Sequence, residues 1–288
     1  FFPIYNPENT YQNQLLKKKD SAWSKAGALL NKTSLQKNFL SGLLNLCIVL
    51  IKKTKYTFLN KQLQSFNVLH KKNNFLIFLY LHFLHLVKTL RLRKAYKKLS
   101  KKFDLNNEFV FFAMHNQPEK TTNPEGQEFD NQLNALKYLR KILDKKIKIF
   151  VKEHPKQLSP FTGDVRQLYS RSEEDYDLIN QIENCDLLNI DIDTKTIIKN
   201  SKLNATITGT LAWESVLQNI PSVTFANTWH SGCKSTPVIN GNLEIATKQI
   251  NELIKKNKTE INDDVLNFSN EINDKIFFTT ISDFEIQN

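Results

Sequence analysis

The fold is decided by residues 109–151, which read FVFFAMHNQPEKTTNPEGQEFDNQLNALKYLRKILDKKIKIFV. The uncharged apolar run at 109–114 predicts a buried strand, and a second run at 147–151 predicts another. Between them, apolar residues recur at spacings of three and four from Phe129 onward, which predicts a helix with one apolar face over 127–143. Strand, helix and strand in this order are typical of a parallel sheet.

The same alternation continues along the chain. Short apolar runs at 187–190, 205–207 and 222–225 predict three more strands, and Asp193 has the position of an N-cap for the helix that follows the first of them. We therefore expect an α/β fold with a Rossmann-like parallel sheet. Ligands of such sheets bind beyond the carboxyl ends of the strands, so candidate site residues should directly follow strands.

The sequence pattern changes near residue 104, from long helical segments to alternating strands and helices. The length of 288 residues suggests about two domains. Residues 1–103 should form a mainly helical, basic region, and residues 104–288 the α/β domain. Residues 1–100 contain 18 Lys/Arg and 2 Asp/Glu, a net charge of +16 within a total of +11. Such a basic block suits an anionic membrane surface or nucleic acid. Because the chain begins at Phe1, we expect the N-terminal region to be incomplete.

Two uncharged stretches, 39–51 and 75–87, are each 13 residues long. A helix of that length spans about 20 Å, whereas the hydrocarbon core of a bilayer is about 30 Å thick, so neither should cross a membrane. Stretch 75–87 predicts a buried helix, or else a membrane-surface element. The three scattered cysteines indicate a reducing, cytoplasmic location.

Two polar clusters directly follow predicted strands. The first, at 115–119, ends in Gln117, Pro118 and Glu119; proline fixes the turn, and a carboxylate there could act as general base toward an acceptor hydroxyl. The second contains Lys152 and His154, which offer donors for a phosphate, and a histidine can also transfer protons near neutral pH.

A third cluster, Thr208-Gly209-Thr210, lies between a predicted strand and a helix that carries Glu214. Free backbone N–H groups at such a turn can bind an anion, and Gly209 allows close approach of the backbone. The spacing is not that of a P-loop or of a dinucleotide fingerprint. An ordinary capped helix is the alternative interpretation.

These pieces together resemble the bacterial capsule polysaccharide biosynthesis glycosyltransferases, which include transferases of 3-deoxy-manno-octulosonic acid from a CMP-linked donor. The resemblance covers about residues 96–240. It rests on five motifs in order: FVFFAMHNQPEKTTNPEG (109–126), FVKEHP (150–155), YSRS (169–172), TITGTLAWE (206–214) and FANTWHSGC (225–233).

The resemblance implies a GT-B fold, in which 104–288 is the nucleotide-sugar-binding domain and 1–103 is part of the acceptor-side domain. It also implies a metal-independent enzyme without a cofactor, peripheral at the inner face of the plasma membrane, that acts on a glycan or lipid-linked acceptor. Glu119 and His154 would be catalytic, and Trp229 and His230 would flank the pocket. The donor-binding residues would be Gln117, Lys152, His154, Arg171, Ser172, Thr208, Gly209, Thr210 and Glu214.

Other functions remain open on the sequence. Asp191-Ile192-Asp193 could hold a divalent metal, although Asp193 is better explained as an N-cap. A teichoic-acid-type glycerophosphotransferase is a second enzyme class with similar chemistry. The basic region could instead belong to a non-catalytic binding module, but lysine outnumbers arginine 16 to 2 in residues 1–100 and no nucleic-acid-binding motif is present.

Overall fold

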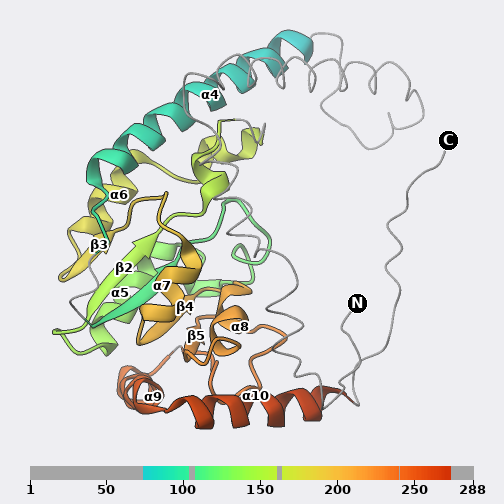
Figure 1. Cartoon of the computed structure of the whole chain (residues 1–288). Helices are drawn as coiled ribbons and strands as arrows, with labels where there is room; N and C mark the ends of the chain where they lie inside the picture. The colour runs from blue at the N-terminus through green and yellow to red at the C-terminus, as the bar shows by residue number, and fades with distance from the viewer. Residues whose placement is uncertain (1–73, 104–107, 161–163, 240, 274–288) are drawn as a thin grey trace.

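The computed structural model of the chain describes residues 74–103, 108–160, 164–239 and 241–273, and its elements are drawn in Figure 1. The strands are β1 (Phe109–Ala113), β2 (Lys148–Lys152), β3 (Cys185–Leu187), β4 (Leu203–Thr206) and β5 (Ser222–Thr224). The α-helices are α4 (Asn74–Leu99), α5 (Gln132–Ile142), α6 (Glu173–Asn180), α7 (Thr194–Asn200), α8 (Leu211–Val216), α9 (Leu243–Lys255) and α10 (Lys258–Asn273). Three short 3-10 helices are η2 (Gln127–Phe129), η3 (Pro155–Leu158) and η4 (Val165–Tyr169).

The strands form one parallel sheet in the order β3-β2-β1-β4-β5. Strand β1 lies at its centre, and all five of its residues are buried. A strand with helices on both faces needs apolar residues at every position, which explains why the run at 109–114 does not alternate. The α/β, Rossmann-like parallel sheet expected from the sequence is confirmed.

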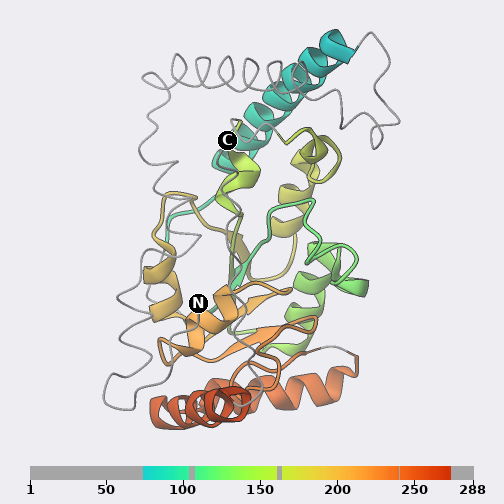
Figure 2. The same ribbon diagram turned by 90° about the vertical axis from the view of Figure 1, so that its right-hand side faces the viewer.

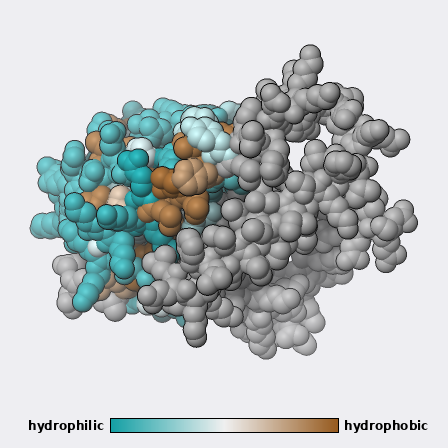
Figure 3. Space-filling model, turned by 90° about the horizontal axis from the view of Figure 1, so that it is seen from above, coloured by the Kyte–Doolittle hydropathy of each residue, from teal (hydrophilic) through white to brown (hydrophobic). Residues whose placement is uncertain are grey.

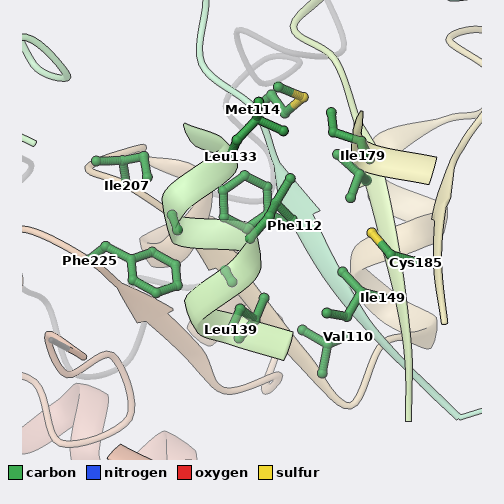
Figure 4. Close-up of a cluster of buried hydrophobic side chains, with 14 of the residues drawn as sticks. Val110, Phe112, Met114, Leu133, Leu139, Ile149, Ile179, Cys185, Ile207 and Phe225 are labelled. Carbon is green, nitrogen blue, oxygen red and sulfur yellow. The ribbon is translucent and has the colours of Figure 1, made fainter. Parts of the chain in front are cut away.

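Helices cover both faces of the sheet, as Figure 2 shows with α5 on one side and α7 on the other. On the α5 side, even-numbered β1 residues such as Val110 and Phe112 lie in one core with Leu133 and Leu139 of α5 (Figure 4). On the α7 side, Phe109 and the other odd-numbered β1 residues pack against α7 and α8. The period of two along β1 therefore divides its side chains between two cores.

Several predicted elements have different bounds in the structure; the strand expected at 205–207, for example, is β4 at Leu203–Thr206. The helix expected over 127–143 is divided, because Asn131 is the N-cap of α5 and its side chain accepts the N–H of Leu133. The strand expected at 187–190 is β3, two residues earlier at Cys185–Leu187. After α8, Asn219 adopts a left-handed φ of 59°, a conformation that asparagine tolerates well.

Helix α4 packs one face against the α/β core, where Leu92 and Tyr96 are buried. The buried face of its preceding turns is polar, because His82, His85 and Thr89 point inward. The opposite, apolar stripe is exposed and consists of Tyr80, Phe83, Val87 and Leu90. Figure 3 looks down on this side and shows an apolar patch within a largely hydrophilic surface.

The prediction that stretch 75–87 is buried is therefore wrong for the exposed side chains of Tyr80, Phe83 and Val87. The pattern indicated a helix correctly, but the polar residues, and not the apolar ones, face the domain. Stretch 39–51 lies outside the described residues. No helix among the described residues is both long and apolar enough to cross a membrane.

Candidate functional site

The strand order of the sheet changes direction at β1. Strands β2 and β3, which follow β1 in the chain, lie on one side of it, and β4 and β5 lie on the other. Loops that leave the carboxyl ends of β1 and β4 therefore go to opposite faces, and the gap between them is where open α/β sheets bind ligands. The turn after β1 carries Glu119, and the turn after β4 is 208–210. Two of the predicted clusters therefore flank this gap, which we call the β1/β4 switch point.

The turn after β1 is held by hydrogen bonds around His115. Its ring is 7% exposed, and its Nδ1 lies 3.6 Å from Oε2 of Glu119. The hydrogen bond and charge of His115 lower the pKa of Glu119 below its ordinary value, with smaller contributions from His154 and Lys156, while burial acts in the opposite sense. Glu119 is therefore ionised at neutral pH, and its side chain is 48% exposed at the rim of the sheet.

The turn after β4 packs directly on His115. The N–H of Thr208 donates to Nε2 of His115 at 3.2 Å, and the Thr208 hydroxyl donates to the Thr121 carbonyl at 2.7 Å. A Cβ on Gly209 would lie only 2.7 Å from Oγ1 of Thr206, so glycine is required here by space. Among the described residues, the N–H groups of Gly209 and Thr210 meet no acceptor.

His154 lies after β2, on the other side of β1. It caps η3, where its Nδ1 accepts the N–H of Lys156 at 3.2 Å. Burial lowers the pKa of His154 to about 4, so the imidazole is neutral at pH 7. With Nδ1 acting as an acceptor, the proton of the neutral ring is on Nε2, and His154 can donate a hydrogen bond without carrying a positive charge.

The neighbouring residues Lys152 and Arg171 use their charged groups in internal contacts. Nζ of Lys152 donates to the Ile192 carbonyl and, at 3.0 Å, to Oγ1 of Thr194, and burial lowers its pKa to about 8. Nε of Arg171 donates to Oε2 of Glu153 at 2.9 Å. The structure therefore does not bring these two groups to the open edge of the sheet.

Glu153 is the centre of a closed polar cluster. Its side chain is fully buried and accepts from Arg171, from the hydroxyl of Tyr176 at 3.0 Å and from the N–H of His154 at 2.8 Å. The Tyr96 hydroxyl accepts the N–H of Glu153 at 3.1 Å. Burial raises the pKa of Glu153, and the charge of Arg171 opposes that shift.

The remaining predicted donor-binding residues occupy three different settings. Gln117 is fixed in its turn, since its N–H donates to Oε1 of Gln157 and its side-chain amide donates to the Asp130 carbonyl. Ser172 is the N-cap of α6 in a capping box with Asp175. Glu214 lies half-buried in the first turn of α8, directly after the 208–210 turn.

The loop after β5 carries an aromatic cluster. Trp229 is 49% exposed and packs edge-on against Trp213 of α8 at a centroid distance of 5.0 Å. His230 is buried beside them and its Nδ1 lies 3.2 Å from Oγ1 of Thr236. Trp229, and not His230, is thus accessible to a ligand at this edge.

The Asp191-Ile192-Asp193 triplet has a structural explanation. Asp193 accepts the N–H of Thr196 at 2.9 Å and is the N-cap of α7, as predicted. Within the described ranges, no group of three or more His, Cys, Asp and Glu side chains is arranged to hold a metal ion.

The sequence reasoning missed the roles of His115 and Gln132. Oε1 of Gln132 accepts the N–H of His115 at 2.8 Å, and the Gln132 amide donates to the His115 carbonyl at 3.2 Å. A polar glutamine within the apolar face of a predicted helix was the available signal. It could indicate a buried hydrogen bond, but not its partner.

Comparison with solved structures gives likenesses of low sequence identity, three of which follow. No family model and no curated protein sequence matches the chain. Among solved structures, the β-Kdo 2,7-transferase KpsC of Thermosulfurimonas dismutans is 14% identical with a TM-score of 0.36, over 62% of this chain and 57% of that one. A structure of S. aureus MnaA with UDP is 15% identical with a TM-score of 0.35, over 55% of this chain and 39% of that one.

A putative UDP-N-acetylglucosamine 2-epimerase of Listeria monocytogenes is likewise 15% identical with a TM-score of 0.35. The alignment covers 56% of this chain and 39% of that one. The chain thus spans well under two thirds of the length of each of these three proteins. At these scores the likenesses carry no functional conclusion, and the function has to be argued from the residues at the switch point.

Proposed function

We propose that the chain is a metal-independent glycosyltransferase of GT-B type that builds surface polysaccharide from a nucleotide-activated, CMP-linked sugar. The observation that carries the proposal is the pairing of Glu119 with the 208–210 turn across the β1/β4 switch point. A carboxylate suited to accept a proton and backbone donors suited to a phosphate lie on the two sides of one ligand-binding gap.

In the proposed reaction, the donor phosphate binds at the N–H groups of Gly209 and Thr210. Glu119 removes the proton from an acceptor hydroxyl, which attacks the anomeric carbon of the donor sugar as the bond to the phosphate oxygen breaks. The departing nucleotide takes the negative charge. Preorganised donors, namely the turn and the neutral His154, stabilise that charge without a metal ion.

Two of the remaining residues are assigned to donor recognition. Glu214 follows the phosphate turn by one helical turn and would contact the nucleotide sugar, while Gln117 fixes the turn that carries Glu119. Lys152, Arg171 and Ser172 would support the donor site through their internal contacts, because their polar groups hold α7, Glu153 and α6 in place.

Calorimetric titration with CMP, CDP, UDP and GDP in the presence of EDTA tests this function. We expect CMP to bind most tightly, and His154→Ala to weaken CMP binding because it removes a donor to the phosphate. Leu178→Ala, an exposed position on α6, is the matched control and should leave binding unchanged. Preferential binding of CDP would favour the glycerophosphotransferase class, and a folded protein that binds no nucleotide would contradict the proposal.

The acceptor is proposed to be a glycan or a lipid-linked glycan at the cytoplasmic face of the membrane. The exposed residues Lys94, Lys97 and Lys98 of α4 belong to the basic block of residues 1–100. Basic residues favour anionic lipid by about 1 kcal/mol each near the surface. Sedimentation with neutral and anionic vesicles tests this point, and equal partitioning between the two would contradict it. A salt-dependent shift of DNA in a gel would favour nucleic acid instead.

A further inference from the structure

His115 connects the two sides of the switch point through its side chain. The residue follows β1 by two positions, and both its N–H and its carbonyl are bonded to the buried side chain of Gln132. This double contact fixes the backbone from which the ring projects. The ring then lies between Glu119 on its own turn and Thr208 on the turn after β4.

The contacts of the ring determine which nitrogen carries its proton. The N–H of Thr208 is only a donor, so Nε2 of His115, 3.2 Å away, must accept. With Nε2 as an acceptor, the Thr206 hydroxyl, whose Oγ1 lies 2.9 Å from Nε2, also donates to it, and the Ala113 carbonyl at 3.2 Å is a second acceptor for the same proton. Because Nε2 accepts, the ring proton is on Nδ1, the nitrogen that faces the Glu119 carboxylate at 3.6 Å.

We propose that His115 is a positioning residue that holds the Glu119 carboxylate and the 208–210 turn in a fixed mutual arrangement. Nδ1 faces the carboxylate at 3.6 Å, and Nε2 accepts the N–H of Thr208 at 3.2 Å. This inference rests on the proposed function, in which the carboxylate activates the acceptor and the turn binds the leaving phosphate. Their relative position then decides whether the attacking oxygen, the anomeric carbon and the leaving oxygen can be aligned.

The packing of Gly209 supports a direct mechanical connection. A Cβ at this position would lie 3.4 Å from Cε1 of His115 in addition to its clash with Thr206. The glycine therefore leaves no side chain between the phosphate turn and the imidazole. A displacement of the ring would therefore move the turn. Because the Thr208 N–H is already bonded to His115, the donor phosphate would bind the N–H groups of Gly209 and Thr210.

The roles of the two ring nitrogens of His115 can be tested separately with two amide variants. Glutamine at 115 reaches the position of Nε2 and can keep the acceptor for Thr208, whereas asparagine reaches the position of Nδ1 and can keep the donor to Glu119. We expect His115→Gln to bind CMP within about twofold of the wild type, and His115→Asn to bind about fivefold more weakly, the effect of one hydrogen bond.

The pH dependence of turnover should change in His115→Gln and stay the same in His115→Asn, the reverse of the order expected for CMP binding. Glu119 faces His115, His154 and Lys156, and the bond from His115 contributes most to its lowered pKa. Turnover should be lost as the pH falls through the pKa of Glu119. This acid limb should move to higher pH in His115→Gln and stay in place in His115→Asn. His85→Gln, which alters another buried histidine, should leave it unmoved.

A measurement on the ligand-free protein keeps the inference separate from the proposed function. Carbon-13 NMR of the Glu119 carboxyl should give a higher pKa in His115→Gln than in the wild type, and an unchanged pKa in His115→Asn. Equal pKa values in all three proteins would overturn the positioning role, whether or not the chain transfers sugar. The expected NMR result in a protein that binds no nucleotide would overturn the proposed function and leave the positioning role intact.

Discussion

The polar residues after β2 and those after β1 and β4 lie along the same edge of one sheet, but they are used in opposite ways. After β2, Glu153 is enclosed by Arg171, Tyr176 and a backbone N–H, and its charge meets no solvent. After β1, the Glu119 carboxylate lies 3.6 Å from His115, and about half of its side chain is exposed. Two carboxylates at the same edge of the sheet thus differ in setting: Glu153 belongs to a buried ion pair, and Glu119 is half exposed.

The difference follows from the strands that flank each cluster. Strands β2 and β3 continue the sheet in one direction, and Tyr176 of α6 reaches Glu153 at the end of β2, while α4 packs against α6, η3 and η4. Between β1 and β4 the connections diverge, and no such cover is required. Enclosure should make the β2 cluster important for stability, and openness should make the β1/β4 cluster important for activity.

The largest expected effect is on turnover, from Glu119→Gln. Removing a general base should lower kcat by about 10² to 10⁴. Because the Glu119 side chain is half exposed, the midpoint of urea unfolding should remain close to that of the wild type. Steady-state transfer assays and urea titrations measure the two quantities. Unchanged turnover in a variant that still binds donor would remove Glu119 from the mechanism.

Arg171→Ala should have the next largest effect, on stability. The substitution leaves the Glu153 carboxylate buried without its cation, a change that destabilises proteins by about 3–5 kcal/mol. The control is Arg166→Ala, which removes an exposed arginine paired with Asp164 and should change little. If both variants unfold at the same urea concentration as the wild type, the β2 cluster is not the structural one.

Lys152→Met should change how stability depends on pH. The pKa of Lys152 is about 8 in the folded chain and 10.5 ordinarily, so the unfolded chain binds more protons between these values. Stability should therefore rise from pH 8 to pH 10.5 in the wild type, by up to about 3 kcal/mol, and this contribution should vanish in the variant. Urea unfolding at both pH values measures it. Lys137→Met, at an exposed position on α5, should keep the wild-type slope.

Ser172→Ala should have the smallest effect. Loss of the N-cap of α6 should lower the free energy of unfolding by about 1 kcal/mol without changing CMP affinity. Ser172→Asp retains a capping side chain and should restore most of the stability. If Ser172→Ala lost CMP binding and Ser172→Asp did not restore it, Ser172 would be a ligand-binding residue. The β2 cluster would then not be purely structural.

Much of the architecture could be predicted from local patterns. The run at 109–114 is apolar at every position, a second short apolar run follows at 147–151, and the helix between them has one apolar face, so a parallel sheet could be predicted. The edge that carries the candidate site also followed, because parallel strands place their carboxyl ends together. Which face of α4 packs against the core could not be predicted, because a stretch that is apolar on nearly every face gives no indication of the side that is buried.

The sequence by itself determined the alternation of strands and helices along residues 109–225, the N-cap at Asp193 and the position of Glu119, His154 and Gly209 after strands. These properties depend on residues within a few positions of one another. The tertiary structure alone decided that Glu153 pairs with Arg171 and that His115 joins Glu119 to Thr208. Thr208 lies 93 residues from His115, and a contact at such separation exists only after the sheet has brought β1 and β4 side by side.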